Sequence, residues 1–167
     1  MVHALTARFS ICRTRADRLA EIGSVVGLVI LVALPLLACS GLPDRVPVHF
    51  DVAGNPDSWS GRWTVFGPPI VALALYAGLT ILARFPHTFN YAWKITRENA
   101  RAQYRLSRSM VIWLKAEMVW LFAYIEWRIL QTATGESDGL DALFLPISST
   151  VLFGTIAYLL FESHKAR

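Results

Sequence analysis

Four apolar blocks constrain this chain more than any other feature. They lie at about residues 22–41, 67–83, 110–131 and 143–161. The hydrocarbon core of a bilayer is roughly 30 Å thick, and a helix crosses it in about 20 residues. Only helices and closed barrels satisfy all their backbone hydrogen bonds in lipid, so we expect helices and no strands in these blocks. The chain is 54% hydrophobic with a mean hydropathy of +0.43, which argues against an ordinary water-soluble domain.

Positive charges alternate from one connecting segment to the next. Lysine and arginine are concentrated before the first block, between the second and third, and after the fourth, whereas the other two connections hold only Arg45 and Arg62. Since Lys and Arg favour the cytoplasmic side, we expect both termini in the cytoplasm and residues 42–66 outside. The sequence predicts a multi-pass protein of the bacterial cytoplasmic membrane. Its net charge of +4 indicates contact with anionic lipid headgroups, not with nucleic acid.

The expected fold class is an all-α integral membrane domain with four transmembrane helices. A basic cytoplasmic tail is expected at residues 1–21, a single four-span domain at 22–162 and a second cytoplasmic tail at 163–167. The outer loop between the first two spans, residues 42–66, is rich in Pro, Gly, Asp and Trp. We expect it to form a short ordered cap on the extracytoplasmic side.

A basic helix is expected at residues 96–109, with Thr96 as its N-cap, continuing into the third span. At about 100° per residue, its arginines fall within a sector of roughly 80°. Two interpretations follow: an anchor whose arginines bind lipid phosphates, or a docking face for an acidic cytoplasmic regulator. The arginines are Arg97, Arg101, Arg105 and Arg108.

The third span contains four ionisable residues, Lys115, Glu117, Glu126 and Arg128. Lys115 and Arg128 lie close enough to its ends for their charges to reach the headgroups. Glu126 lies nearer the outer end and Glu117 is deep. An acid inside the membrane costs about 2.5–3.5 kcal/mol on insertion scales, so both acids are candidates for a specific role.

Glu117 has possible partners in the fourth span, where Thr155 and Tyr158 lie at a matching depth. A protonated Glu117 that hydrogen-bonds one of these hydroxyls is the structural interpretation. A proton or cation relay and a contact between copies of the chain are the alternatives.

The outer loop reads as a hairpin. Residues 46–51 alternate as in an extended segment, residues 54–57 (Gly-Asn-Pro-Asp) are typical of a turn, and residues 62–66 are expected to return as a second short strand.

The loop also holds the candidate ligand-binding residues His49, Asp51, Asp57 and Arg62. They can recognise a ligand on a rigid cap. Alternatively they are structural, with Asp57 paired to Arg62 and His49 bonded to backbone. One His with two Asp at this spacing fits no standard zinc pattern. Nothing supplies an activated nucleophile with its base, so we expect no enzyme, metal or cofactor.

The string Leu-Pro-Asp-Arg-Val-Pro-Val-His-Phe-Asp, followed by Gly-Asn-Pro-Asp and Arg-Trp, resembles the bacterial domain-of-unknown-function family 1648. Residues 89–104 also resemble family members, so the likeness covers about residues 22–130. Sdp-type immunity proteins, which protect a bacterium against a secreted toxin and take part in signalling, carry this domain at their N-terminus. The family pattern corresponds here to Pro43, Pro47, His49, Gly54, Asp57 and Arg62.

Three functions are consistent with these patterns. The first is non-enzymatic binding or sensing at the outer face, immunity- or signalling-like by resemblance, with an extracytoplasmic peptide or protein as ligand. The second is a small transporter or proton-coupled carrier subunit that uses Glu117. The third is a structural membrane subunit.

Overall fold

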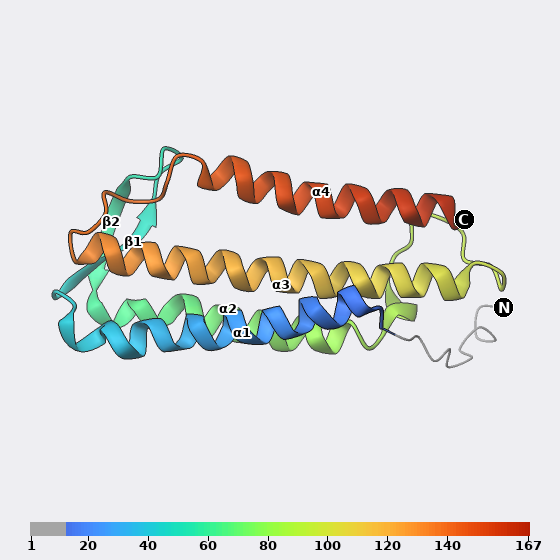
Figure 1. Cartoon of the computed structure of the whole chain (residues 1–167), viewed down its shortest axis with the longest axis horizontal. Helices are drawn as coiled ribbons and strands as arrows, with labels where there is room; N and C mark the ends of the chain where they lie inside the picture. The colour runs from blue at the N-terminus through green and yellow to red at the C-terminus, as the bar shows by residue number, and fades with distance from the viewer. Residues whose placement is uncertain (1–12) are drawn as a thin grey trace.

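The computed structural model describes residues 13–167, which form four long helices and a two-stranded hairpin (Figure 1). The first twelve residues, part of the predicted basic tail, lie outside the described range. The helices run side by side along the long axis of the molecule. The elements are α1 (Arg15–Ala38), η1 (Cys39–Gly41), β1 (Arg45–Phe50), β2 (Pro56–Gly61), η2 (Arg62–Phe66), α2 (Gly67–Leu82), η3 (Pro86–Thr88), α3 (Ala100–Ala133) and α4 (Phe144–Lys165).

Three stretches of the described chain are long and apolar enough to cross a membrane: Arg15–Gly41, Arg62–Leu82 and Phe144–Lys165. They correspond to three of the four predicted spans, those at about residues 22–41, 67–83 and 143–161. The remaining predicted span, residues 110–131, lies within the 34-residue helix α3. Helix α3 is long enough to cross a membrane, but its charged side chains make it less apolar than the three stretches above. The predicted continuity between the basic segment and this span is confirmed from Ala100 onward.

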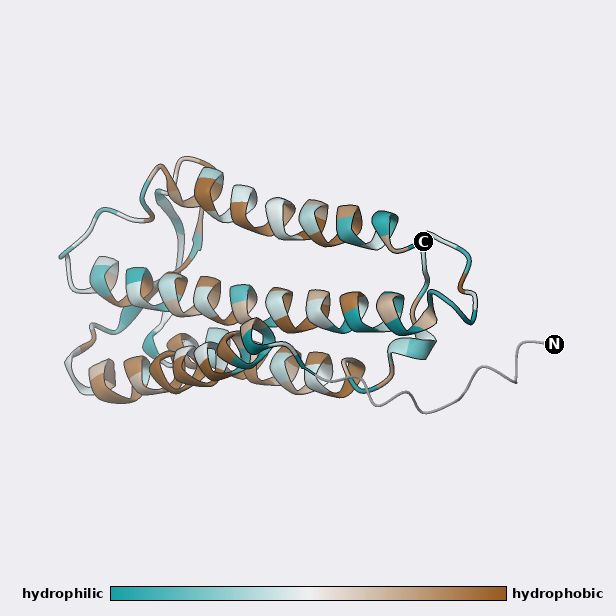
Figure 2. Cartoon of the chain, turned by 45° about the vertical axis from the view of Figure 1, so that its right-hand side comes forward, coloured by the Kyte–Doolittle hydropathy of each residue, from teal (hydrophilic) through white to brown (hydrophobic). Residues whose placement is uncertain are grey.

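Helix α3 occupies the centre of the bundle, in contact with α1, α2, α4 and β1. Figure 2 shows that α1 and α2 are hydrophobic along most of their length, whereas α3 mixes polar and apolar residues. Because three other helices pack against α3, its polar side chains can meet protein groups instead of lipid. Close packing with α1 occurs at Gly27, where an added Cβ would lie 2.9 Å from Cγ1 of Val119.

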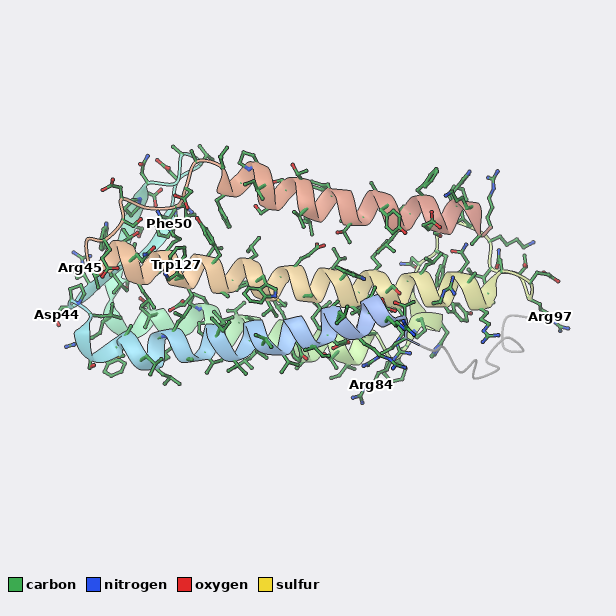
Figure 3. The ribbon with its side chains drawn as sticks, in the orientation of Figure 1. Asp44, Arg45, Phe50, Arg84, Arg97 and Trp127 are labelled. Atoms are coloured by element: carbon green, nitrogen blue, oxygen red, sulfur yellow. The ribbon has the colours of Figure 1, made fainter. Side chains whose placement is uncertain are left out.

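The two ends of the bundle differ in character (Figure 3). One end, which we term the cap end, carries the hairpin with Asp44, Arg45 and Phe50. The other, which we term the basic end, carries Arg84 and Arg97. Helix α1 begins and α4 ends at the basic end, so the described termini lie on the same side of the bundle (Figure 1).

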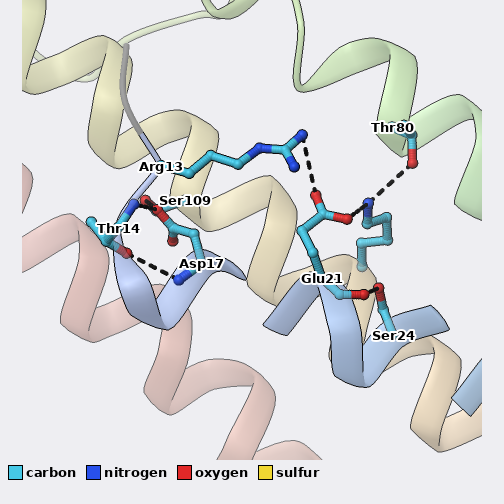
Figure 4. A network of polar contacts seen from close by, with 8 residues as sticks. Arg13, Thr14, Asp17, Glu21, Ser24, Thr80 and Ser109 are labelled. Carbon is cyan, nitrogen blue, oxygen red and sulfur yellow. Dashed lines mark hydrogen bonds and ion pairs between the residues drawn. The ribbon is translucent and has the colours of Figure 1, made fainter. Parts of the chain in front are cut away.

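A buried ion pair joins three helices near the basic end (Figure 4). The Lys115 side chain is 0% exposed, and its Nζ lies 2.8 Å from Oε2 of Glu21 on α1. The same ammonium donates to Oγ1 of Thr80 on α2 at 3.0 Å and lies 4.5 Å from the ring centroid of Tyr76. The expectation that Lys115 reaches the headgroups is therefore wrong. Its neighbours provide a carboxylate, a hydroxyl and a ring face at its own depth.

Helix α1 begins earlier than the predicted span because its first turn is capped. Thr14 Oγ1 accepts the N–H of Asp17, and the Asp17 carboxylate accepts the N–H of Thr14, which is a capping box. Asp17 is buried and also accepts from Ser109 Oγ of α3 at 3.1 Å (Figure 4). Residues 15–21, predicted as part of the tail, are thus the first turns of a helix docked on α3.

The hairpin forms where it was predicted, but its second strand starts earlier. Strand β1 pairs antiparallel with β2, and Arg45 lies opposite Gly61. The predicted return strand at residues 62–66 is wrong, since this segment is the 3-10 helix η2. The turn already closes at Asn55, so pairing begins at Pro56 and reaches the start of β1 by Gly61.

The tip of the hairpin docks on the connection between α3 and α4. The N–H of Leu140 donates to the carbonyl of Gly54 at 2.8 Å. Arg128 Nε donates to the carbonyl of the adjacent Gly139 at 2.7 Å. Gly54 has a φ of 91°, and a Cβ there would overlap the Leu140 carbonyl. We term the hairpin and residues 134–143 together the outer cap.

The buried ion pair makes a prediction about stability. Glu21→Ala leaves the Lys115 ammonium buried without its carboxylate and should lower the free energy of unfolding by about 3–5 kcal/mol. The double variant Glu21→Leu with Lys115→Met should lose clearly less, because no buried unpaired charge is left and Arg13, the other partner of Glu21, is exposed to solvent. Unfolding of the purified protein in detergent measures both. Equal losses in the single and double variants would contradict the assignment, and Glu136→Ala, at an exposed acid, is the control.

The docking of the hairpin tip makes a second prediction. Gly54→Ala should destabilise the outer cap by about 1–3 kcal/mol through backbone strain and should speed proteolysis within residues 134–143. Gly61→Ala, in the same cap but with open space around it, should leave both unchanged. Limited proteolysis read by mass spectrometry separates the two variants, and identical cleavage would show that the docking contributes nothing.

Candidate functional site

The outer cap brings two of the four predicted ligand-binding residues together. His49 Nδ1 lies 2.6 Å from Oδ1 of Asp57 across the two strands. The side chains are 68% and 46% exposed. The predicted alternative, in which His49 bonds backbone and Asp57 pairs with Arg62, is wrong. The strands place the imidazole of β1 next to the carboxylate of β2, and Arg62 lies beyond the end of the sheet.

Arg62 instead secures the base of the hairpin. Its Nη2 lies 3.1 Å from Oδ1 of Asp44, and its N–H donates to the Asp44 carbonyl at 3.0 Å. Nearby, Arg45 Nη2 donates to the carbonyl of Trp59 at 3.0 Å. Both arginines therefore have structural contacts at the point where the chain enters and leaves the hairpin.

Asp51 builds the turn and is not available as a free ligand-binding group. Its Oδ1 accepts the N–H groups of Ala53 and Asn55 at 2.9 and 2.8 Å, and Oδ2 accepts from the Asn55 side chain at 3.2 Å. These bonds, led by the backbone N–H of Asn55, hold the pKa of the Asp51 carboxyl below its usual value. Asp51 is thus an ionised Asx-turn residue at neutral pH.

Two hollows flank the His49–Asp57 pair. His49 lines one of about 440 Å³, together with residues 50–54 and with Leu140, Asp141, Ala142, Phe144 and Leu145. Asp57 lines another of about 670 Å³ with Pro43, Arg45, Ser58, Trp59 and Ala133. The first hollow combines residues from both parts of the outer cap. The pair thus stands between two recesses that have polar and apolar walls.

Sequence reasoning missed the contacts that hold residues 134–143 in place. Asp141 accepts from the Tyr124 hydroxyl and lies 3.5 Å from Nη2 of Arg128. The Tyr124 ring stacks on Phe144 with centroids 4.8 Å apart. Arg128 reaches toward the cap end, as expected, but it contacts protein groups of this connection. The sequence signal for these contacts was weak: an arginine near the end of the third span, followed by an acidic loop.

Glu117 forms a hydrogen bond with Thr155, one of its two predicted partners on the fourth span. Thr155 Oγ1 donates to Glu117 Oε1 at 2.5 Å, which links α3 to α4. Glu117 Oε2 has no hydrogen-bond partner among the described residues. Tyr158, the other expected partner, is 63% exposed and does not bond Glu117. The hydrogen bond is compatible with both the structural and the relay interpretation.

Glu126 is more completely enclosed than Glu117. It is 0% exposed, and neither carboxyl oxygen has a hydrogen-bond partner within residues 13–167. It lies on the face of α3 that meets α1 and the base of the hairpin, between two apolar clusters.

The predicted basic helix starts four residues late. Thr96 and Asn99 cap each other, since Asn99 Oδ1 accepts the N–H of Thr96 at 2.8 Å and Thr96 Oγ1 accepts the N–H of Asn99 at 3.3 Å. This turn precedes α3, so Arg97 lies outside the helix. Arg97, Arg101 and Arg105 are exposed, and Arg108 is half-buried. The three exposed arginines are therefore accessible to phosphates from outside the chain.

Within the described part of the chain, no group of three or more His, Cys, Asp or Glu side chains is arranged to hold a metal ion. The groups that the outer cap can offer to a ligand are the His49 imidazole, the Asp57 carboxylate and the apolar walls of the two hollows.

Comparison with known proteins finds a family match that includes the hairpin. An uncharacterized protein of the archaeon Archaeoglobus fulgidus is 28% identical over 75 residues, which cover 40% of this chain and 41% of that protein. This chain thus spans about two fifths of the length of that relative. No solved structure matches. Residues 26–73, from the middle of α1 through the hairpin into α2, match the family described as domain of unknown function (DUF1648). The predicted resemblance is therefore confirmed for the loop motif, and this membrane protein carries a DUF1648 domain at residues 26–73.

Proposed function

We propose that this protein is a non-enzymatic membrane protein that binds a peptide or protein at the extracytoplasmic face through its outer cap. The observation that carries the proposal is the exposed His49–Asp57 pair between two hollows. Even a fully charged pair contributes only about 0–1 kcal/mol to stability at an exposed position, so stability alone gives little reason for this arrangement. The resemblance to immunity proteins, which act against a secreted toxin, supports a ligand that arrives from outside.

In this proposal α3 also crosses the membrane, as the third of four transmembrane helices in chain order. Its polar residues face protein groups: Lys115 meets Glu21, and Glu117 meets Thr155. A helix enclosed in this way can carry ionisable groups through the membrane, since they face the bundle interior. A 22-residue stretch such as 110–131 rises about 33 Å, which suffices to cross the hydrocarbon.

The orientation follows from the distribution of positive charge. The basic end carries Arg84 and Arg97 and the described termini, whereas the cap end pairs its arginines with acids or carbonyls. By the positive-inside rule the basic end is cytoplasmic and the outer cap is outside. The exposed arginines at 97, 101 and 105 then lie at the height of anionic headgroups, where we propose that they bind lipid phosphates.

A second candidate function is ion or proton transfer through Glu117. The observation in its favour is the partly bonded carboxyl at the α3–α4 contact, with one oxygen on Thr155 and the other without a partner among the described residues. This function predicts that Glu117→Gln abolishes activity while variants of the outer cap retain it.

The orientation can be measured by cysteine accessibility. In a chain with Cys12 and Cys39 replaced by alanine, Ser58→Cys should react with a membrane-impermeant maleimide in intact cells. Arg101→Cys should react only after permeabilisation. Both positions are exposed in the structure, so differences in burial do not confuse the result. The reverse pattern would invert the orientation and overturn the proposal of outer recognition.

Recognition at the outer cap can be tested with a photocrosslinking amino acid at Val52, which is 92% exposed on the rim of the first hollow. We expect an adduct in cells that is lost with His49→Ala or Asp57→Asn and kept with Glu117→Gln. Arg62→Ala is a poor test because it also breaks the contact with Asp44. The same crosslinker at Ser40, exposed at the cap end but outside the hollows, is the control. An adduct unchanged in both pair variants would rule out their role.

A further inference from the structure

Glu126 is the buried ionisable group that the proposed recognition function does not use. One turn toward the basic end, Ala123 packs with Leu31 of α1 and Ala72 of α2. One turn toward the cap end, Leu130 packs in a second apolar cluster. The second cluster consists of Leu42, Val46, Val65, Ile129 and Leu130. The carboxyl thus lies between two apolar clusters, fully buried and without a hydrogen-bond partner among residues 13–167.

The helices packed on this face provide no opposite charge. Helix α1 has no charged residue after Glu21, and its later titratable group is Cys39, just beyond its end. Helix α2 has no charged residue along its length, and its one titratable side chain, Tyr76, contacts Lys115. On α3 itself Lys115 lies eleven positions away and is paired with Glu21.

The charged groups of the outer cap are already in contact with other partners. On α3, Arg128 bonds the Gly139 carbonyl and lies near Asp141. On β1, Arg45 bonds the Trp59 carbonyl. The remaining titratable groups of β1 and η2, His49 and Arg62, are in contact with Asp57 and Asp44 respectively. No cation of the packed elements is therefore placed to neutralise Glu126.

An ionised carboxylate in such surroundings is strongly disfavoured, whereas a neutral carboxylic acid is tolerated. Lys115 shows the contrast, because its charge is buried with a carboxylate and a hydroxyl.

We propose that Glu126 is a proton-binding site within the bundle. Its carboxyl holds one proton in the folded protein. On release the O–H bond breaks, the electron pair stays on the carboxylate and the proton passes to water at the cap end. That end is the nearer one, since α3 ends seven residues later, about 10 Å along the helix. The charge that remains lies between apolar clusters and weakens the packing of α3 on α1 and the hairpin.

Carbodiimide labelling tests whether the acid carries a proton. Dicyclohexylcarbodiimide enters lipid and reacts with protonated carboxyl groups to give a stable acylurea. The full chain in phosphatidylethanolamine–phosphatidylglycerol vesicles should be modified at Glu126. Labelling should fall about tenfold per pH unit once the acid ionises. E126Q should lose this modification, and E117Q should keep it. Labelling of Glu126 that does not change with pH would overturn the proposal.

A second measurement covers the case in which the reagent does not reach the site. Because the folded state holds the proton more tightly than the unfolded state, the wild type should lose thermal stability relative to E126Q as pH rises. The two proteins should unfold at similar temperatures only below about pH 4, where the carboxyl is protonated in the unfolded chain as well. Parallel pH curves would overturn the proposal, as would a relative gain of the wild type at higher pH. Stabilisation of the wild type alone by Na⁺ or K⁺ at fixed pH would show a metal-cation site in place of a proton site.

Discussion

The buried contact of Lys115 with Glu21 and Thr80 is the interaction on which the arrangement of the helices depends. An ammonium group without water needs a carboxylate and further acceptors. Here these come from two other helices, so α1, α2 and α3 must meet at one depth for the charge to be accommodated. Apolar packing against lipid does not fix such a depth, because apolar side chains have little preference between lipid and one another. The ion pair therefore sets the register of the three helices, and the contacts of Asp17 with Ser109 and of Gly27 with Val119 are consistent with that register.

The same register brings the hairpin to the end of α3. Val46 of the hairpin and Val65 of η2 pack on Leu130, and the connection after α3 bonds Gly54 at the hairpin tip. The hairpin is thus held at its base by helix α3 and at its tip by the α3–α4 connection. A two-stranded hairpin is marginal alone in water, and here its order comes from these contacts. The exposed His49–Asp57 pair is presented on a fixed base for this reason.

Much of the architecture could be predicted from residue types. Apolar block length gave the helices, Gly54 and its neighbours gave the turn, and the loop motif gave the DUF1648 domain. Pairings between distant residues could not be predicted, because they depend on which helices adjoin. Lys115 was expected to reach the headgroups since its two partners are 94 and 35 positions away. Thr155 was found as a partner of Glu117 because depth in a membrane follows from position along a span. The partners of His49 and Arg62 depend on the register of the two strands. Strand β2 begins six residues before the predicted strand, so His49 meets Asp57 and Arg62 meets Asp44.

The attachment of α4 has a consequence for biosynthesis. Its polar links to α3 are the Glu117–Thr155 bond and the two bonds between Gln103 and Ser163, and all of them use residues near the end of the chain. During translation, α1, α2 and α3 emerge before α4 and can already form the ion pair among themselves. Glu117 and Gln103 then face the lipid or the insertion machinery until α4 arrives. Insertion of α4 is thus the step that gives Glu117 its hydroxyl partner, and a chain that stalls before residue 155 exposes an unsatisfied acid to the bilayer.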